Sequence, residues 1–174
     1  MKFRSPYTND GIHCPQQYFD QFDSLFSQLV DPSMVAAIIM EPIQGEGGYI
    51  VPPVEFVQYV RNDCDTHGIM LIFDEVQTGF GRTGKMFAYE HFGVKPDIMS
   101  TAKALGAGFP LSAVIAKKEI MEQWPSGAHG GTFGGNPVSC AAGLASIGVL
   151  EDGALDLLLG FHVGAQAAQM GAGL

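Results

Sequence analysis

Apolar residues are arranged in two ways along this chain, at helical spacing and in short unbroken runs. After Pro15, aromatic and aliphatic side chains recur every three or four positions up to Val30, which predicts an amphipathic helix ending before Asp31. Residues 35–40 (VAAIIM) are apolar without alternation. Such a run is typical of a strand covered on both faces, as in a parallel sheet.

A second helix and a second strand follow at once. The helix is expected to open at Pro52 and Pro53 and to end at Gly68. Its inward positions are Val57, Val60 and Cys64. Residues 69–73 (IMLIF) are another buried-strand run. Together these segments predict a strand–helix–strand unit, with the helix crossing the sheet.

The rest of the chain continues the alternation of strands and helices. Residues 96–102 lead into Lys103, residues 111–116 predict one more strand, and residues 138–150 predict a buried helix of small and apolar residues. Asn136 is suited to cap that helix. The order indicates an α/β fold with a mostly parallel sheet, in which ligands bind at the carboxyl ends of the strands.

The charge balance narrows the function. The 174 residues include 9 Lys and Arg against 18 Asp and Glu, a formal net charge of -9. This balance argues against binding to nucleic acid or to an anionic membrane. Charged residues make up only 16%, below the roughly 25% of ordinary soluble domains, so we expect contacts between subunits.

The cysteines and the first residues of the sequence bear on the cellular compartment that we expect. Three widely spaced cysteines, Cys14, Cys64 and Cys140, favour neither a disulfide framework nor a cysteine-rich metal site. No targeting segment is visible after Met1, so we expect a cytoplasmic protein without a metal. Residues 157–174 carry no Asp, Glu, Lys or Arg, but glycines dilute them too much for a membrane span.

Two charged residues follow predicted strands. Asp74 comes after five apolar residues and Lys103 precedes a glycine-rich turn. Asp74 could instead cap a helix or pair with Arg82, and a lysine is more often a surface charge. If both face one crevice, the lysine can form a Schiff base with a carbonyl, and the aspartate can pair with a pyridinium nitrogen.

A third candidate is the glycine-rich segment 129–137. Its backbone N–H groups, the Thr132 hydroxyl and the start of a helix are suited to an anion such as phosphate. The alternative is an ordinary glycine turn, since the lysine of a P-loop is missing. Residues 45–48 (GEGG) likewise do not match a dinucleotide-binding fingerprint.

Four motifs in order carry a family resemblance. They are residues 41–48 (EPIQGEGG), 73–84 (FDEVQTGFGRTG), 102–113 (AKALGAGFPLSA) and 129–137 (HGGTFGGNP). Over about residues 33–153 the chain resembles class III aminotransferases, which are pyridoxal-phosphate enzymes of fold type I. Within the class it most resembles 4-aminobutyrate aminotransferases. The resemblance implies that the chain is part of the large, mostly parallel-sheet domain.

The resemblance also implies roles for individual residues. Lys103 would bind pyridoxal 5'-phosphate as a Schiff base, and Asp74 would pair with the pyridine nitrogen. Gln77 would hydrogen-bond the phenolic oxygen of the ring, while Val76 packs under it. The implied activity is transfer of an amino group from an amine such as 4-aminobutyrate to a 2-oxo acid.

The resemblance implies two further roles, and these depend on a neighbouring subunit or on an arginine that this sequence does not match. Thr132 would contact the cofactor phosphate of the neighbouring subunit in a homodimer. Glu46 would gate substrate carboxylates by pairing with a late arginine, for which this sequence has no match. The family's upstream phosphate loop and stacking aromatic residue are also not recognisable, and Ala107 stands where many relatives have glycine, a change expected to matter little.

These departures define the expected organisation. We expect residues 1–156 to be a partial cofactor-binding domain and residues 157–174 to be an atypical neutral tail from truncation or a frame change. The isolated chain is then expected to be inactive. The alternative to an aminotransferase is a non-catalytic remnant that acts at most by binding another subunit.

Overall fold

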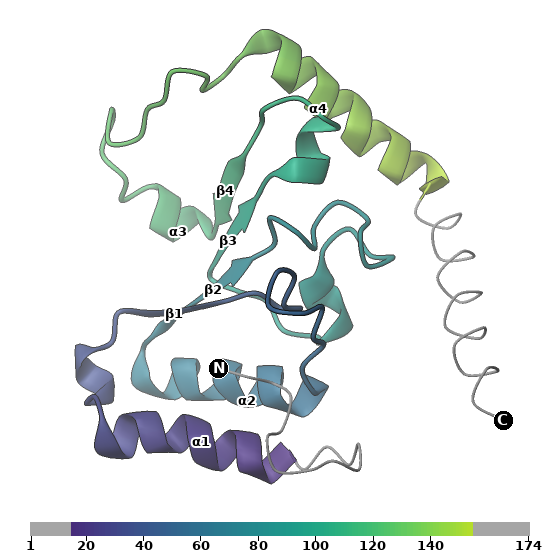
Figure 1. Ribbon diagram of the computed structural model, residues 1–174. Helices are drawn as coiled ribbons and strands as arrows, with labels where there is room; N and C mark the ends of the chain where they lie inside the picture. Colours follow the sequence, from purple (N-terminus) through teal and green to yellow (C-terminus); the bar gives the residue numbers. More distant parts are fainter. Residues whose placement is uncertain (1–14, 155–174) are drawn as a thin grey trace, which may run out of the picture.

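The computed structural model describes residues 15–154, which form a four-stranded sheet with helices around it (Figure 1). The strands are β1 (Ala37–Met40), β2 (Met70–Asp74), β3 (Ile98–Thr101) and β4 (Ala113–Ala116), in that spatial order. β1, β2 and β3 are parallel, and β4 runs antiparallel to β3. The α/β fold with a mostly parallel sheet is confirmed.

The helices connect the strands. They are α1 (Pro15–Gln28), α2 (Val54–His67), α3 (Lys118–Met121) and α4 (Pro137–Val149). Four shorter helical segments are η1 (Pro32–Met34), η2 (Ala88–His91), η3 (Lys103–Gly106) and η4 (Leu150–Ala154). Within residues 15–154, no helix has the length and apolar character that crossing a membrane requires.

The larger core lies where α1 and α2 pack side by side against the sheet (Figure 1). Three predicted inward positions of α2, Val57, Val60 and Cys64, are at most 1% exposed. Gly68 ends α2 in the left-handed conformation, at φ 70, as its C-cap. The helical spacing therefore predicted the buried face of α2, and Gly68 predicted its end.

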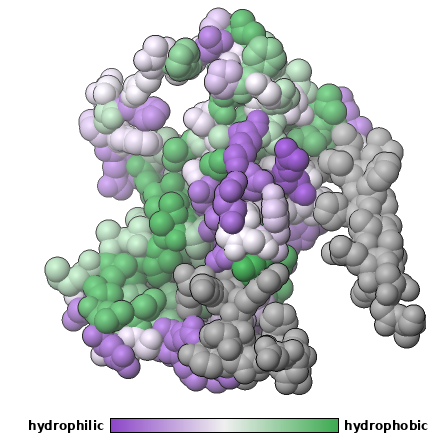
Figure 2. Space-filling model, viewed as in Figure 1, coloured by the Kyte–Doolittle hydropathy of each residue, from purple (hydrophilic) through white to green (hydrophobic). Residues whose placement is uncertain are grey.

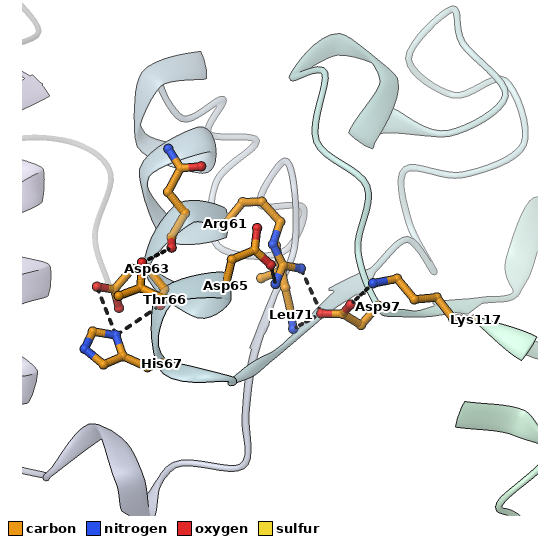
Figure 3. Close-up of polar contacts among 9 residues, drawn as sticks. Arg61, Asp63, Asp65, Thr66, His67, Leu71, Asp97 and Lys117 are labelled. Carbon is orange, nitrogen blue, oxygen red and sulfur yellow. Dashed lines mark hydrogen bonds and ion pairs between the residues drawn. The ribbon is translucent and has the colours of Figure 1, made fainter. Parts of the chain in front are cut away.

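A buried carboxylate ties four elements together (Figure 3). Asp97, just before β3, accepts hydrogen bonds from Leu71 N at 2.8 Å, Arg61 Nη1 at 2.8 Å and Lys117 Nζ at 2.5 Å. Burial alone would raise the pKa of Asp97, but the hydrogen bonds from Lys117, Leu71 and Arg61 lower it to about 2. We call this cluster the Asp97 clamp.

Two expectations about burial are wrong. β1 is not covered on both faces, since Ile39 is 66% exposed, and α4 is not buried, since Leu144 is 72% exposed. The reason is the same for both, because nothing among residues 15–154 packs on these faces. A broad apolar area lies over α1 and β1 on the surface (Figure 2). The predicted tail, residues 157–174, lies outside the described residues, and the boundary at residue 156 stays a prediction.

Candidate active site

Asp74 ends β2 at the carboxyl edge of the sheet. Its Oδ1 accepts hydrogen bonds from Val76 N at 3.0 Å and from Ser100 Oγ at 3.2 Å. Ser100 is the register partner of Asp74 on β3, so the strand pairing itself supplies one donor. No ion pair joins Asp74 to Arg82 within the described residues. The half-buried carboxylate therefore has hydrogen-bond donors but no structural cation.

Lys103 follows β3 and begins η3. Its backbone lies in the left-handed region, at φ 43, which few residues other than glycine adopt. Its side chain is directed to the Asp74 turn, where Nζ donates a hydrogen bond to Gln77 Oε1. Strained backbone of this kind is concentrated at functional positions. The strain here sets the direction of the lysine amine.

The loop after β1 approaches Gln77 closely. A Cβ at Gly45 would lie 2.9 Å from Gln77 Cγ, a distance that real Cβ atoms essentially never show. Glycine at this position is what allows the two loops to meet. The structure thus brings Asp74, Gln77 and Lys103 together at one edge of the sheet, with half-buried Val76 in the same turn.

Two predicted site residues are not joined to this cluster in the described structure. Thr132 is exposed and lines a separate hollow of about 760 Å³ with Pro110, Leu111 and Ser112. Glu46 is also exposed, and the carboxylate anchored in its loop is that of Glu41, which accepts a hydrogen bond from Gly45 N at 2.7 Å. The roles of Thr132 and Glu46 stay predictions.

Sequence reasoning missed Glu75, which is fully buried directly behind Asp74. Its carboxylate accepts hydrogen bonds from Thr78 Oγ1 at 2.5 Å, Ala88 N at 3.0 Å and Tyr89 N at 2.8 Å. Burial raises the pKa of Glu75, and these three hydrogen bonds oppose that rise. The spacing of Glu75 and Thr78 was a local signal, but the donors at 88 and 89 are remote in sequence. Glu75 anchors the turn that carries Val76 and Gln77.

A hollow of about 580 Å³ opens beside Gln77, between the loops that follow β1 and β2. Arg82 and His91 lie in its wall. Ligand sites of open α/β sheets occur at this edge. Within the described residues, no group of three or more His, Cys, Asp or Glu side chains is arranged to hold a metal ion.

Comparison with models of protein families shows which family this chain belongs to. The family model "Aminotransferase class-III" matches residues 3–159. The chain belongs to the class III aminotransferases. The match includes every residue of the Asp74, Gln77 and Lys103 cluster.

Individual class III relatives differ in the substrates that their names give. The chain is 52% identical over 134 residues to acetylornithine aminotransferase of Methanocaldococcus jannaschii, covering 77% of this chain and 33% of the relative. It is 47% identical over 135 residues to the probable 4-aminobutyrate aminotransferase of Bacillus subtilis, covering 78% and 31%. The chain therefore spans about a third of the length of these curated relatives.

Solved aminotransferase structures share the fold. A transaminase from the marine bacterium Virgibacillus superposes with a TM-score of 0.72 at 35% identity, over 80% of this chain and 33% of its own. The ornithine aminotransferase of Toxoplasma gondii ME49 gives 0.70 at 43% identity, over 77% and 32%. The sheet described here is thus part of a fold type I large domain.

Proposed function

We propose that this chain supplies the cofactor-attachment part of a pyridoxal-phosphate aminotransferase. One observation carries the proposal: Lys103, on strained backbone after β3, directs its amine to Gln77, three residues beyond Asp74 on β2. A covalent attachment point and a carboxylate that can pair with a protonated pyridine nitrogen then share one edge of the sheet. Their types and places match what the class III resemblance implies.

The described residues fit pyridoxal 5'-phosphate. The Asp74 carboxylate accepts hydrogen bonds from Val76 N and Ser100 Oγ and forms no ion pair with a residue of 15–154, so it is available to a protonated ring nitrogen. Lys103 offers an exposed primary amine. When bound, the cofactor supplies an electron sink for the bond changes at the amine-bearing carbon. The ornithine aminotransferase of T. gondii, crystallized in presence of oxidized glutathione, has partial occupancy of PLP at its active site.

The chain's own groups have separate tasks in this chemistry. Asp74 would keep the ring nitrogen protonated, because a carboxylate next to it favours the positively charged form. Lys103 would hold the cofactor, and its amine, when free, would move a proton to and from the amine-bearing carbon of the substrate. Gln77, which accepts a hydrogen bond from Lys103, would hydrogen-bond the phenolic oxygen of the ring. Glu75 keeps the turn of Gln77 fixed.

Substrates, partners and location are also part of the proposal. We propose an amine donor of the 4-aminobutyrate type and a 2-oxo acid acceptor, supported by the B. subtilis relative's name and by the motif resemblance. A homodimer would give Thr132 its task at the partner's cofactor phosphate. We also propose a cytoplasmic location, supported by the three widely spaced cysteines, which favour no disulfide framework.

Amino transfer can be measured by isotope in the assembled enzyme that contains this chain. With ¹⁵N-labelled 4-aminobutyrate and 2-oxoglutarate, we expect ¹⁵N-glutamate, and no product from the Lys103→Ala variant. Labelled glutamate at equal rates from both proteins would contradict the role of Lys103. The 174-residue chain alone is expected to give no sustained turnover, and steady turnover by it would show that the missing parts are dispensable.

A further inference from the structure

The carboxylate of Asp74 is anchored through only one of its two oxygen atoms. Oδ1 accepts both of the hydrogen bonds described above, from Val76 N at 3.0 Å and from Ser100 Oγ at 3.2 Å. Among residues 15–154, Oδ2 accepts no hydrogen bond and forms no ion pair. A carboxylate oxygen is an acceptor only, so this arrangement leaves Oδ2 for a donor from a ligand.

The two donors to Oδ1 differ in what holds them. Val76 N is two residues beyond Asp74 and moves with the same turn. Ser100 is 26 residues away on β3, where it is the register partner of Asp74. Its carbonyl oxygen also accepts a hydrogen bond from Glu75 N at 2.9 Å, so the strand pairing fixes its backbone. The Ser100 hydroxyl is therefore the donor that ties the carboxylate to the sheet.

Strand β3 bears on both groups that are proposed to hold the cofactor. It ends at Thr101, and Lys103 follows two residues later, three residues beyond Ser100. The strand that places the lysine amine thus also places the donor to Asp74. Orientation matters for such a pair, because a hydrogen bond weakens steeply when its angle at the donor hydrogen falls toward about 120°.

We propose that Ser100 is a positioning residue for Asp74, and that its hydroxyl holds Oδ1 so that Oδ2 faces the protonated ring nitrogen of the cofactor. The inference rests on the proposed function, because that function supplies the ring nitrogen. It adds a residue of β3 that acts through Asp74, and it names the carboxylate oxygen that makes the contact.

Two cofactors that differ in one ring atom test the proposal in the assembled enzyme that contains this chain. In 1-deazapyridoxal 5'-phosphate a C–H group replaces the ring nitrogen, so this analogue has no ring N–H to donate to Asp74. Ser100→Ala should weaken binding of pyridoxal 5'-phosphate on the order of tenfold, as for loss of one hydrogen bond to a charged group. Binding of the deaza analogue should change by less than about twofold, whereas a general loss of structure would weaken both.

Ser100→Thr keeps a hydroxyl on a strand residue and should retain the parent's affinity for both cofactors. Ser24→Ala is the matched control, because Ser24 is also half-buried and donates one side-chain hydrogen bond, to Gln21 O, but lies on α1. It should leave both affinities unchanged. Circular dichroism establishes that each variant is folded. If Ser100→Ala unfolds, Ser100→Cys takes its place, since a thiol is only a weak donor.

The orientation of the carboxylate can also be measured without the cofactor. NMR three-bond couplings to Cγ of Asp74 in the 174-residue chain report the side-chain rotamer. The parent and Ser24→Ala should show one rotamer, and Ser100→Ala should show an average over several.

The outcomes separate this inference from the proposed function. Equal effects of Ser100→Ala on the two cofactors, or an Asp74 rotamer that Ser100→Ala leaves unchanged, overturn the role of Ser100 and leave the aminotransferase proposal intact. Failure of the assembled enzyme to bind pyridoxal 5'-phosphate overturns the aminotransferase proposal, and the couplings still decide whether Ser100 orients Asp74.

Discussion

The backbone conformation of two residues shapes the turn around η3, which begins at Lys103. Lys103 and Ala107 bracket η3, and both lie in the left-handed region, at φ 43 and φ 49. Such a conformation costs an L-residue about 1–2 kcal/mol. At Lys103 the strain directs the amine, whereas the Ala107 side chain is exposed. The strained backbone at Ala107 therefore directs no side chain into the site.

Ala107→Gly should therefore stabilise the chain. Removing the strained Cβ is expected to raise the free energy of unfolding by about 0.5–1 kcal/mol, after the larger entropy of glycine in the unfolded chain is subtracted. Ala141→Gly, at an exposed position of helix α4, should lower it by a similar amount. Urea unfolding of both variants measures the difference. A lower free energy of unfolding in Ala107→Gly would contradict the claim that the backbone at Ala107 is strained.

Asp74→Asn tests the electron-sink role at nearly constant size. The amide cannot hold a proton on the pyridine nitrogen by charge, so the rate of the first half-reaction in the assembled enzyme should fall on the order of 10²- to 10⁴-fold. Asp20→Asn, an exposed change on α1, removes the same charge and should leave the rate unchanged. Stopped-flow spectroscopy follows the half-reaction. An Asp74→Asn rate equal to the parent's would contradict the assignment.

Individual elements are held in place by polar groups that lie far apart in the sequence. The Asp97 clamp joins α2 through Arg61, β2 through Leu71 N, and the end of β4 through Lys117. The side chain of Asp97 is only 8% exposed, so these bonds are poorly screened by water. The clamp fixes the amino end of the parallel strands, opposite the edge that carries Lys103.

The clamp predicts a pH dependence of stability. The pKa of Asp97 is lowered to about 2, against about 3.9 when unfolded, so its contribution is present above about pH 4 and is lost as pH falls toward 2. Asp97→Asn should lower the free energy of unfolding by at least about 2 kcal/mol at pH 7. The difference in unfolding free energy between the parent and Asp97→Asn should be smaller at pH 3, where part of the contribution of Asp97 is lost.

Asp65→Asn provides the comparison for the clamp, because Asp65 pairs with the same arginine but is 66% exposed. Its effect should stay below about 1 kcal/mol at both pH values. Urea unfolding at pH 7 and pH 3 measures all three proteins. A gap between parent and Asp97→Asn that is equal at both pH values would rule out the ionised clamp.

The elements that sequence predicted best are those decided by local patterns. The spacing of Val57, Val60 and Cys64 and the Gly68 cap are local properties, and both are confirmed. Asp74 and Lys103 could be placed at strand ends for the same reason. The clamp and the hydrogen bonds from Ala88 N and Tyr89 N to Glu75 could not be predicted, because the partners are 13 to 36 residues apart. The predicted burial of β1 and α4 was wrong, because nothing among residues 15–154 packs on their exposed faces.

At the scale of the whole molecule, large apolar side chains are exposed on several elements of the described part of the chain. Ile39 on β1, Leu29 after α1 and Leu144 on α4 are all more than 60% exposed. Among the described residues, β1 pairs only with β2, so its other edge has free backbone groups. Such an edge is a template for association.

Ile39→Lys should reduce that association. A charge on the free edge opposes strand pairing, so the monomer fraction measured by light scattering should rise, with a change in unfolding free energy of less than about 1 kcal/mol. Val149→Lys, which places the same charge on exposed α4, should have a smaller effect. Equal effects of the two substitutions would show that the β1 edge is not the contact.

Covalent trapping of the cofactor tests the central claim most directly. The 174-residue chain is incubated with pyridoxal 5'-phosphate, reduced with borohydride and mapped by peptide mass spectrometry. The pyridoxyl label is expected on Lys103, because its amine is directed to the Gln77 and Asp74 edge. The same experiment on Lys103→Ala provides the background. A label on Lys85, Lys95 or Lys117 instead, or an equal label in both proteins, would contradict the account.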